Sequence, residues 1–489
     1  MDNTINKNIN NVLLANAFYL KNDPKQLLEK FKPYPPLAAL YAASSLEEKQ
    51  IKVTLFDATL SSSSDEFSRY LSNIQPDLLV ICEDSFNFLS KMCLSHVRDA
   101  TIAMIAITKK LKTANIPVVI NSSDAADEPK IYLDAGADYV IVGEVEQSLV
   151  ELVDWLNTKR ESRNEQPTGL IYNTDGQWGR SNLRKNNRNL DNLPQPAWHL
   201  VNIEKYQLAW QRHHGYYSIN MVTSRGCPYH CNWCAKPIWG QQYVCHSPEY
   251  IVKQIQKFSQ FKQPDHIWFC DDIFGLKKGW VELFSQLMQA QNIRIPFMIQ
   301  TRSDLLDASA VTSLKQAGCQ QVWLGVESGS QSILDAMNKE LKLEQVHEAR
   351  QLLQQAGIST GFFIQLGYVN EGVDELQATR DMIVSLRPEE IGVSVSYPLP
   401  GTEFFNKVQN QLDNKTHWQD SNDLDTVFKS TFRADFYRLI RNHLHSELDA
   451  LLANPNCSST KVHWQQQWDQ LILSVDQYHN RINATSVTI

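Results

Sequence analysis

Three cysteines crowd into one short stretch of the sequence and carry its clearest chemical signal. Cys227, Cys231 and Cys234 follow one another with three and two residues between them. Three thiolates in one tight loop can hold three irons of a [4Fe–4S] cubane and leave the fourth iron without a cysteine. An open iron suits a cluster that binds and reduces a ligand, because an electron-transfer cluster normally has a fourth cysteine. No further cysteine lies at a standard spacing from these three.

Structural zinc and a fully ligated electron-transfer cluster are the alternatives to an open cluster. His230 adds a fourth group of a type that zinc accepts. However, the adjacent side chains of His230 and Cys231 point in different directions and rarely share one tetrahedron, and zinc knuckles usually pair two separated dyads. The spacing therefore favours an iron–sulfur cluster with Cys227, Cys231 and Cys234 as metal ligands and catalytic centre.

The elements that must position these cysteines form a series of strand–helix units. From residue 218 onward, short apolar runs alternate with helical patterns. The predicted strands are Ile219–Thr223, His266–Phe269, Pro296–Gln300, Gln321–Val326, Gly361–Leu366 and Ile391–Ser396. Six such units predict a partial (βα)6 barrel over residues 218–410, and the cysteine stretch directly follows its first strand.

Polar or turn-forming residues lie at the end of each of the five strands that come after the first in this predicted barrel. They are Asp271 and Asp272, Arg302, Glu327, Gln365, and the run Pro398–Gly401 that contains Pro400. Barrel enzymes place their active sites at the carboxyl ends of the strands, so these side chains are candidates for one site. Taken singly, Asp271 and Asp272 could instead cap the next helix, and Arg302 could form a surface ion pair.

The first third of the chain predicts a separate α/β domain. Five short apolar runs, separated by amphipathic stretches, predict a doubly wound parallel sheet of flavodoxin-like type over residues 10–158. Ligands of such sheets bind beyond the carboxyl ends of the strands. Those ends carry Asp57, the run Cys82–Ser85 with Glu83 and Asp84, the run Asn121–Ser123, and Gly143 with Glu144. A hairpin at Gly169–Arg180 and a polar linker complete residues 159–217, and residues 411–489 predict a small, mostly helical region.

Bulk composition excludes several classes of protein. The formal charge is −8, which argues against general nucleic-acid binding, although it leaves room for a local basic pocket. No apolar run approaches the ~18–20 residues that cross a bilayer. Nine cysteines are too few for a disulfide scaffold of 489 residues. We therefore expect a cytoplasmic protein without a membrane span.

The cysteine spacing, with aromatic Trp233 just before the last cysteine, resembles the signature of the radical S-adenosylmethionine (SAM) superfamily. The resemblance implies that the open iron chelates SAM, and that one electron from the cluster releases a 5′-deoxyadenosyl radical. It also implies the SAM contacts. Trp233 and the backbone around Pro400 lie near the adenine, Asp271 or Asp272 accepts from the amino group, Arg302 pairs with the carboxylate, and Glu327 and Gln365 bind ribose hydroxyls.

A doubly wound domain ahead of such a barrel resembles the cobalamin-binding branch of the superfamily. The likeness extends to anaerobic Mg-protoporphyrin IX monomethyl ester cyclase-like proteins and class B radical SAM methyltransferases, and includes Phe436–Arg438 near the C-terminus. It implies cobalamin contacts from Asp57, Glu83, Asp84, Ser85, Gly143 and Glu144. The sequence departs from methionine synthase-like domains in lacking an Asp-x-His-x-x-Gly loop; before residue 199 its only histidine is His96. A Rossmann-like domain with another cofactor, or none, is the alternative.

The resemblance implies methyl transfer to an unactivated carbon of a small-molecule, lipid or tetrapyrrole-like substrate. One SAM methylates cobalamin, and a second yields the radical that activates the substrate. Reduced flavodoxin or ferredoxin is the expected electron donor. Oxidative cyclisation of a tetrapyrrole-like substrate without methyl transfer is the second expectation, and a zinc-stabilised binding module is the third.

Overall fold

The computed structural model describes residues 8–22, 30–83, 86, 94–111, 116–159, 162, 165–174, 177–234, 240–412 and 424–480. The chain packs as two compact units. Unit 1 comprises Met1–Cys227, Lys236–Asp272 and Ala290–Phe297, and unit 2 comprises Pro228–Ala235, Ile273–Gln289 and Met298–Ile489. The boundary between the units therefore falls inside the cysteine stretch and inside the predicted barrel.

Unit 1 contains a seven-stranded sheet in the order β2-β1-β3-β4-β5-β6-β7. Its parallel strands are β1 (Asn11–Ala15), β2 (Lys52–Phe56), β3 (Leu78–Cys82), β4 (Val118–Asn121) and β5 (Tyr139–Ile141). The hairpin β6 (Leu170–Thr174) and β7 (Gln177–Arg180) extends it antiparallel. The parallel order 2-1-3-4-5 is that of flavodoxin-like sheets, so the predicted doubly wound fold is confirmed.

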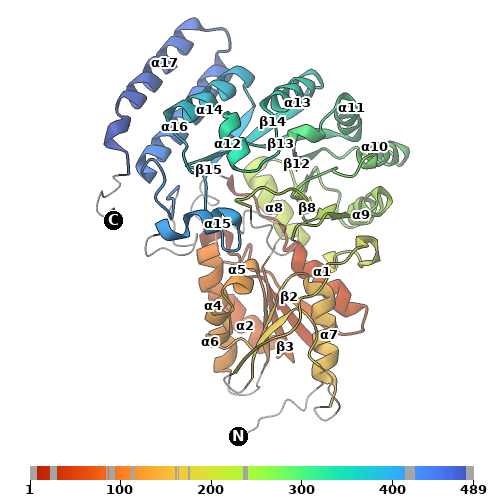
Figure 1. Ribbon diagram of the computed structural model, residues 1–489. Coiled ribbons are helices and arrows are strands. Elements are labelled where there is room, and N and C mark those ends of the chain that lie inside the picture. Colours follow the sequence, from red (N-terminus) through yellow and green to blue (C-terminus); the bar gives the residue numbers. More distant parts are fainter. Residues whose placement is uncertain are drawn as a thin grey trace, which may run out of the picture. The chain divides into compact units, whose positions relative to one another are not determined.

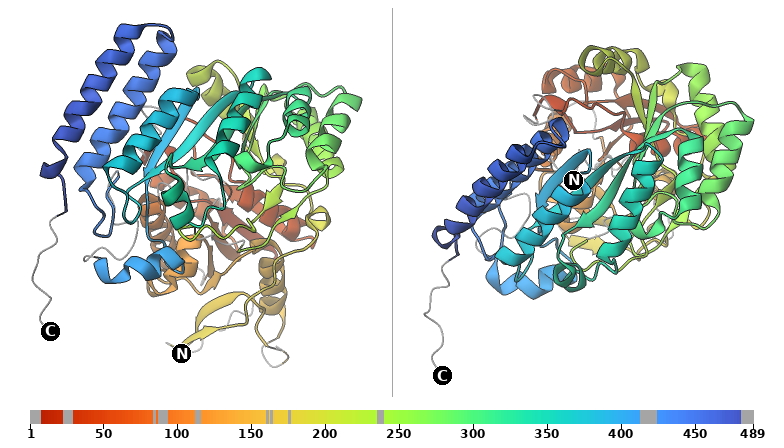
Figure 2. Two further views of the ribbon diagram at one scale, coloured as in Figure 1. Left: turned by 45° about the horizontal axis from the view of Figure 1, so that its top comes forward. Right: turned by 90° about the horizontal axis from the view of Figure 1, so that it is seen from above.

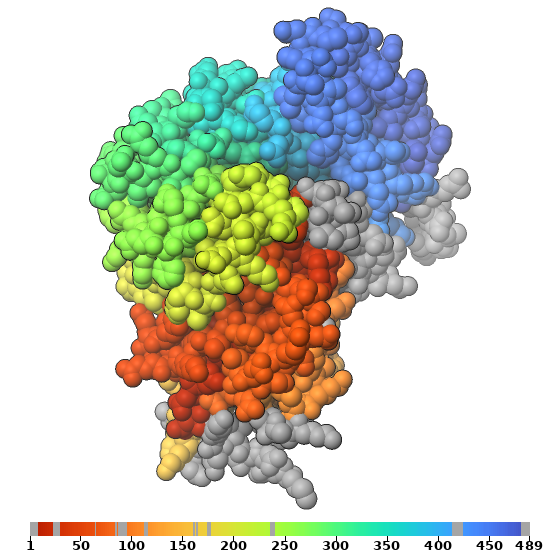
Figure 3. All heavy atoms as spheres, turned by 180° about the vertical axis from the view of Figure 1, so that it is seen from behind, coloured from red at the N-terminus to blue at the C-terminus, as the bar shows by residue number. Residues whose placement is uncertain are grey.

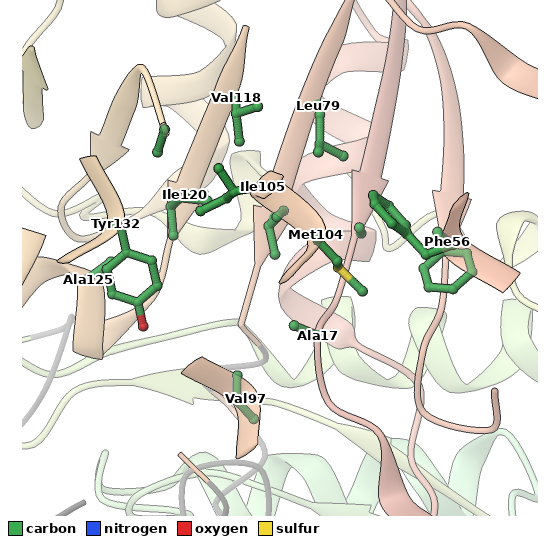
Figure 4. Packing of buried hydrophobic residues seen from close by; sticks show 14 of the residues in the cluster. Ala17, Phe56, Leu79, Val97, Met104, Ile105, Val118, Ile120, Ala125 and Tyr132 are labelled. Carbon is green, nitrogen blue, oxygen red and sulfur yellow. The ribbon is translucent and has the colours of Figure 1, made fainter. Parts of the chain in front are cut away.

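Helices cover both faces of this sheet (Figure 1). Helices α1 (Leu37–Glu47) and α7 (Val145–Asn157) pack together on one face. The other face carries α2 (Ser64–Ile74), α4 (Leu94–Lys110), α5 (Ser123–Asp127) and α6 (Pro129–Asp134). Figure 4 shows Met104 and Ile105 of α4 among strand residues such as Leu79 and Val118, in one buried apolar cluster. Burial on both faces explains why the strands read as continuous apolar runs.

The segment for which we expected a linker contains a helix, α8 (Ile203–His214), that buries one face. The Asn202 side chain accepts from Lys205 N–H at its start, and Gly215, with φ of 75°, ends it in the left-handed conformation. Trp210 is fully buried and donates from Nε1 to the carbonyl of Pro33 at 2.6 Å. The helix is therefore part of unit 1 rather than a polar strap.

The second sheet has six strands in the order β15-β14-β13-β12-β11-β8. These are β8 (Ser218–Met221), β11 (His266–Phe269), β12 (Phe297–Thr301), β13 (Cys319–Glu327), β14 (Ser359–Leu366) and β15 (Glu390–Val395). The neighbours β8 and β11, β13 and β14, and β14 and β15 pair in parallel. Each strand overlaps a predicted one, which confirms the partial barrel.

Helices follow the barrel strands as expected. They are α9 (Pro248–Phe261), α10 (Trp280–Ala290), α11 (Ala308–Ala317), α12 (Gln331–Ala336), α13 (Leu343–Gln355) and α14 (Val373–Leu386). A short antiparallel pair, β9 (Ser224–Arg225) with β10 (Val244–Cys245), follows β8. None of the described helices combines the length and apolarity that a bilayer crossing requires.

The C-terminal region is helical, as predicted. It contains α15 (Glu403–Val408), α16 (Ala434–Ala453) and α17 (Ser458–Leu473), and α16 lies beside both α14 and α17 (Figure 2). The buried guanidinium of Arg380 on α14 contacts both carboxylate oxygens of Glu447 on α16, at 2.7 and 2.6 Å. Every residue of α17 is described, and only Trp468 among them is buried. In Figure 3 this helix lies at the surface of unit 2.

Candidate functional site

None of the three cysteines of the signature forms a disulfide. Cys227, Cys231 and Cys234 are all half-buried, whereas Cys270 and Cys319 are buried in the structure. In the described residues, no group of three or more His, Cys, Asp or Glu side chains is arranged as a ready metal site. The fit to an iron–sulfur cluster therefore rests on the donor set, since accessible thiols in one loop are what such a cluster requires.

Asn232 anchors the loop between the second and third cysteines. Its backbone N–H donates to the Met337 carbonyl at 3.0 Å, and its side-chain amide donates to the Ala336 carbonyl at 2.7 Å. Its side-chain oxygen accepts from the hydroxyl of Tyr368 at 2.8 Å, and its carbonyl accepts from Phe404 N–H at 3.0 Å. Because all four polar groups are used, Asn232 fixes the backbone that carries the cysteines. The sequence analysis did not identify this role.

Trp233 lies where a ligand could use its indole N–H. Its ring packs against a buried apolar cluster of unit 2 that contains Met337, Tyr368 and Phe404. Its Nε1 is buried and has no hydrogen-bond partner among the described residues. A buried N–H without an acceptor costs free energy, which a bound ligand can recover. The predicted contact between Trp233 and SAM thus stays a prediction, with a donor available for it.

Arg302 is buried and belongs to a network of the protein itself. Its guanidinium contacts Asp304 at 2.8 Å and donates to the carbonyls of Lys339 and Glu340 at 2.9 and 2.8 Å. It also stacks on the ring of Tyr229 at 3.7 Å. With a side chain only 4% exposed, Arg302 is not the surface residue of the alternative interpretation. Its predicted pairing with the SAM carboxylate requires Asp304 to share the guanidinium.

Glu327 stands at an irregular point of β13. Its φ is 71°, and the pairing register shifts between Gly325 and Glu327. Its carboxylate accepts from the buried ammonium of Lys339 at 2.8 Å. A Cβ at position 325 would lie 3.0 Å from both groups of this ion pair, which explains the glycine there. The predicted ribose contact of Glu327 therefore competes with, or is oriented by, Lys339.

Asp271 and Asp272 differ sharply in their surroundings. Asp271 is buried, and its Oδ1 accepts from the Thr223 N–H and hydroxyl at 2.9 and 2.8 Å and from the Ser224 hydroxyl at 2.5 Å. Burial raises the pKa of Asp271 to about 7, against the opposing effect of these hydrogen bonds. Asp272 is exposed. Asp271 thus ties the end of β11 to the residues before Cys227, and either contact with SAM stays a prediction.

The last two predicted SAM residues are Gln365, the second-to-last residue of β14, and Pro400, which follows β15. Gln365 is buried, and its side-chain oxygen accepts from the Ser396 hydroxyl at 3.1 Å. Pro400 is half-buried in a turn that Gly401 continues with a φ of 79°. Both lie at carboxyl ends of strands, as predicted, while their contacts with SAM stay predictions.

Comparison with known proteins identifies this part of the chain. The model of the Radical SAM superfamily matches residues 221–383. Residues 221–383 form a radical SAM domain. Domains of this family use a [4Fe–4S] cluster and SAM, in agreement with the three-cysteine stretch that the match includes.

Relatives extend the likeness beyond the radical SAM domain. An uncharacterized methyltransferase of Pyrococcus horikoshii is 26% identical over 405 residues, which cover 81% of this chain and 83% of the relative. The anaerobic magnesium-protoporphyrin IX monomethyl ester cyclase of Rubrivivax gelatinosus is 25% identical over 286 residues. The second match covers 56% of this chain and half of the cyclase.

Solved structures share the fold. The cobalamin-dependent radical SAM enzyme OxsB, with aqua-cobalamin and SAM bound, matches with a TM-score of 0.70 and 16% identity, over 96% of this chain and 72% of its own. The radical SAM methyltransferase TsrM from Kitasatospora setae, with tryptophan substrate and a SAM analogue bound, matches with a TM-score of 0.63 and 17% identity. That match covers 78% of this chain and 72% of TsrM. At these identities the likeness establishes the fold.

In unit 1, the doubly wound sheet ahead of the radical SAM domain carries polar residues at its strand ends. Asp57 is half-buried; it accepts from the Tyr206 hydroxyl at 2.6 Å, and the partial loss of water raises its pKa. Glu83 accepts from the N–H of Ser123 at 3.1 Å, and the Gly143 carbonyl accepts from the Asn121 amide at 3.1 Å. Asp84 and Ser85 lie outside the described residues. The structure brings the described groups to one edge of the sheet.

Glu144, also predicted to contact cobalamin, holds a buried arginine. Its carboxylate lies 2.9 Å from the guanidinium of Arg225, which also lies 2.6 Å from Glu146. The guanidinium sits 5.5 Å from the ring of Tyr41. Arg225 and Glu146 were missed in the sequence, where the available signal was an arginine two residues before the first signature cysteine.

A cavity of about 280 Å³ opens near the same edge of the sheet. It is lined by Tyr19 and Lys21, which follow β1, and by His96, Asp99 and Met104 of α4, which follows β3. Strands β1 and β3 are neighbours whose connections leave in opposite directions, so the cavity lies at the topological switch point of the sheet. Ligands of doubly wound sheets bind at this point, and His96 faces it.

Glu371, after β14, is a buried acid that the sequence analysis missed. Its Oε2 accepts from Gly367 N–H, while its Oε1 has no partner among the described residues. Burial raises the pKa of Glu371 to about 8, and the charge of Glu375 adds to the rise. The folded state thus binds a proton that the unfolded state loses above its pKa of about 4.5.

Stability should therefore fall as the pH rises from about 4.5 to 8, with a slope of up to about 1.4 kcal/mol per pH unit from this one group. Glu371→Gln, which is permanently neutral, should flatten that slope and stabilise the protein at pH 8. Urea unfolding at pH 5, 6.5 and 8 measures it, with exposed Glu348→Gln as the matched control. An unchanged slope in Glu371→Gln would show that Glu371 ionises normally.

Proposed function

We propose that the protein is a cobalamin-dependent radical SAM enzyme that methylates an unactivated carbon. One observation carries the proposal: a radical SAM domain follows a flavodoxin-like sheet that has a cavity at its switch point. The fold likeness to the cobalamin-bound OxsB structure and the similarity to a methyltransferase of Pyrococcus horikoshii support it. Reduced flavodoxin or ferredoxin is the proposed electron donor, and the substrate is a small molecule, with lipids and tetrapyrroles included.

The residues of the radical SAM domain suit the binding and orientation of a cluster and SAM. When bound to Cys227, Cys231 and Cys234, the cluster supplies the electron that cleaves SAM, and cobalamin supplies the carrier for the methyl group. Asn232 holds the cysteine loop in place through four hydrogen bonds. Trp233 offers an indole N–H to the nucleoside, and Glu327 is held by Lys339 at 2.8 Å for a hydroxyl of the ribose.

In the domain ahead of the barrel, the described strand-end groups and the cavity are proposed to hold cobalamin. The carboxyl groups of Asp57 and Glu83 and the carbonyl of Gly143 lie at the carboxyl edge of the sheet, where they could accept hydrogen bonds from the amides of a corrin. The described residues between β1 and α1 contain no histidine, so they do not supply the histidine of a methionine synthase-like loop. Asp84, Ser85 and Glu144 remain in the proposed contact set, although Glu144 already binds Arg225.

Nucleoside analysis tests this function without knowledge of the substrate. The protein is reconstituted anaerobically with iron and sulfide, with or without hydroxocobalamin, and incubated with SAM labelled in the methyl group and a reductant. We expect about four irons per chain, 5′-deoxyadenosine in both samples, and S-adenosylhomocysteine only with cobalamin. A single zinc per chain would contradict the cluster.

The same experiment separates methylation from its alternative. The similarity to magnesium-protoporphyrin cyclase supports ring formation without methyl transfer. Deoxyadenosine formed without cobalamin-dependent S-adenosylhomocysteine would exclude methylation and favour that reaction. Transfer of labelled methyl groups from SAM to cobalamin would contradict ring formation without methyl transfer.

A further inference from the structure

A tight turn of unit 2, residues 336–340, is docked on the cysteine loop. The Asn338 side chain donates to the His230 carbonyl at 2.9 Å. On the other side of Cys231, Asn232 donates to the carbonyls of Met337 and Ala336 at 3.0 and 2.7 Å. These three hydrogen bonds fix the turn against the residues that flank Cys231.

The turn adopts a conformation that costs free energy. Asn338 and Glu340 both have positive φ, of 52° and 51°, on either side of Lys339. Left-handed conformations are unfavourable for side-chain-bearing residues, and least so for asparagine. The conformation aims the side chain of Lys339 into the interior, where it is 7% exposed and 2.8 Å from Glu327.

A second cation is held by the same turn. Arg302 donates to the carbonyls of Lys339 and Glu340, so both cations share one framework. Burial lowers the pKa of Lys339, but the charges of Glu327 and Cys231 together raise it above its ordinary value. Burial likewise opposes the charge of Arg302, whereas Asp304, Tyr229 and Cys231 favour it. Arg302 also lies 3.7 Å from the ring of Tyr229, two residues before Cys231, so the framework that holds both cations packs against the cysteine loop.

We propose that Lys339 is a positioning residue that raises the reduction potential of the iron–sulfur cluster through its buried positive charge. This inference rests on the proposed cluster at Cys227, Cys231 and Cys234. Reduction adds one negative charge to a site whose ligands are already anionic. A cation fixed in a medium of low dielectric stabilises that added charge more than water would, and net charge is one of the levers that set such potentials.

The test compares reduction potentials in SAM-free protein, so that SAM contacts of Glu327 do not enter. Removal of Lys339 alone leaves Glu327 as an uncompensated buried charge, which destabilises proteins. The main comparison is therefore between Glu327→Gln and Lys339→Met/Glu327→Gln, because these two variants differ only in the charge at position 339. Lys339→Arg keeps the cation. Arg380→Met/Glu447→Gln removes an equally buried ion pair elsewhere in unit 2 and serves as the matched control.

Each variant is reconstituted with iron and sulfide, and its cluster is titrated by EPR at fixed solution potentials. We expect the ratio of reduced to oxidised cluster in Lys339→Met/Glu327→Gln to be about tenfold lower than in Glu327→Gln at a given potential, a shift of about 59 mV to lower values. Lys339→Arg and the control pair should keep the wild-type potential.

The outcomes separate this inference from the proposed function. Wild-type protein that binds no cluster would contradict the function itself. A wild-type cluster together with equal potentials in Glu327→Gln and the doubly neutral variant would leave Lys339 a structural role and overturn the inference. An equal shift in Arg380→Met/Glu447→Gln would do the same, because it would assign the effect to general loosening of the unit.

Discussion

Replacement of Cys231 by serine is expected to remove the iron–sulfur cluster and with it all reductive cleavage of SAM. The reconstituted variant should hold less than about one iron per chain instead of about four, and 5′-deoxyadenosine should fall to background. The reason is that a cubane with only two thiolate ligands would have two irons without protein ligands. A serine hydroxyl is a poor substitute, since it is not deprotonated at neutral pH.

The fold should survive this change, which makes the result specific. Cys231 is half-buried, and the polar contacts that fix its loop come from Asn232 and Asn338 rather than from the thiol. Cys457→Ser is the matched control, since Cys457 is a half-buried thiol at the start of α17. It should retain iron and activity. Full iron content in Cys231→Ser would mean that the cluster has other ligands.

The strands of both sheets could be predicted from the sequence because burial imposes a simple pattern. A parallel strand covered on both faces is apolar at nearly every position, as Leu78–Cys82 is, and such runs stand out between amphipathic helices. Helix α8 was missed because most of its residues are polar. Only Ile203, Tyr206 and Trp210 are buried, and the helical spacing of these three is weak beside the prolines that precede them.

The types of residue at the candidate site could be predicted, but their partners could not. Barrel geometry alone places Arg302, Glu327 and Gln365 at carboxyl ends of strands. Their pairing with Asp304, Lys339 and Ser396 depends on how the loops fold back. The loop that carries Lys339 shows no chemical motif; its role follows from positive φ values and hydrogen bonds that only coordinates reveal.

Glu144 illustrates the same limit in unit 1. Its position after a strand of a doubly wound sheet favours a ligand contact, yet a residue 81 positions further along the chain occupies its carboxylate. That residue, Arg225, leads through Gly226 directly to the first cysteine of the signature. The ion pairs therefore join the start of helix α7 to the beginning of the cysteine stretch, inside one compact unit.

Arg225→Met is expected to lower the free energy of unfolding by about 3–5 kcal/mol. Its guanidinium is 3% exposed, and the carboxylates of Glu144 and Glu146 are 7% and 5% exposed. Methionine would leave two neighbouring carboxylates buried without a cation, and one of them would have to take up a proton or reach water. Arg225→Lys should recover part of the loss, because an ammonium keeps the charge but cannot bridge both carboxylates as a planar fork does.

The triple variant Arg225→Met/Glu144→Gln/Glu146→Gln separates charge from shape. With no buried charge left, its stability in urea should return to within about 1–2 kcal/mol of the wild type, since replacing a whole buried ion network is often nearly neutral. If the arginine also orders the cysteine stretch, the triple variant should fold well and yet bind less iron after reconstitution. Equal stability of Arg225→Met and wild type would contradict the network. Normal iron content in a stable triple variant would confine Arg225 to the stability of unit 1.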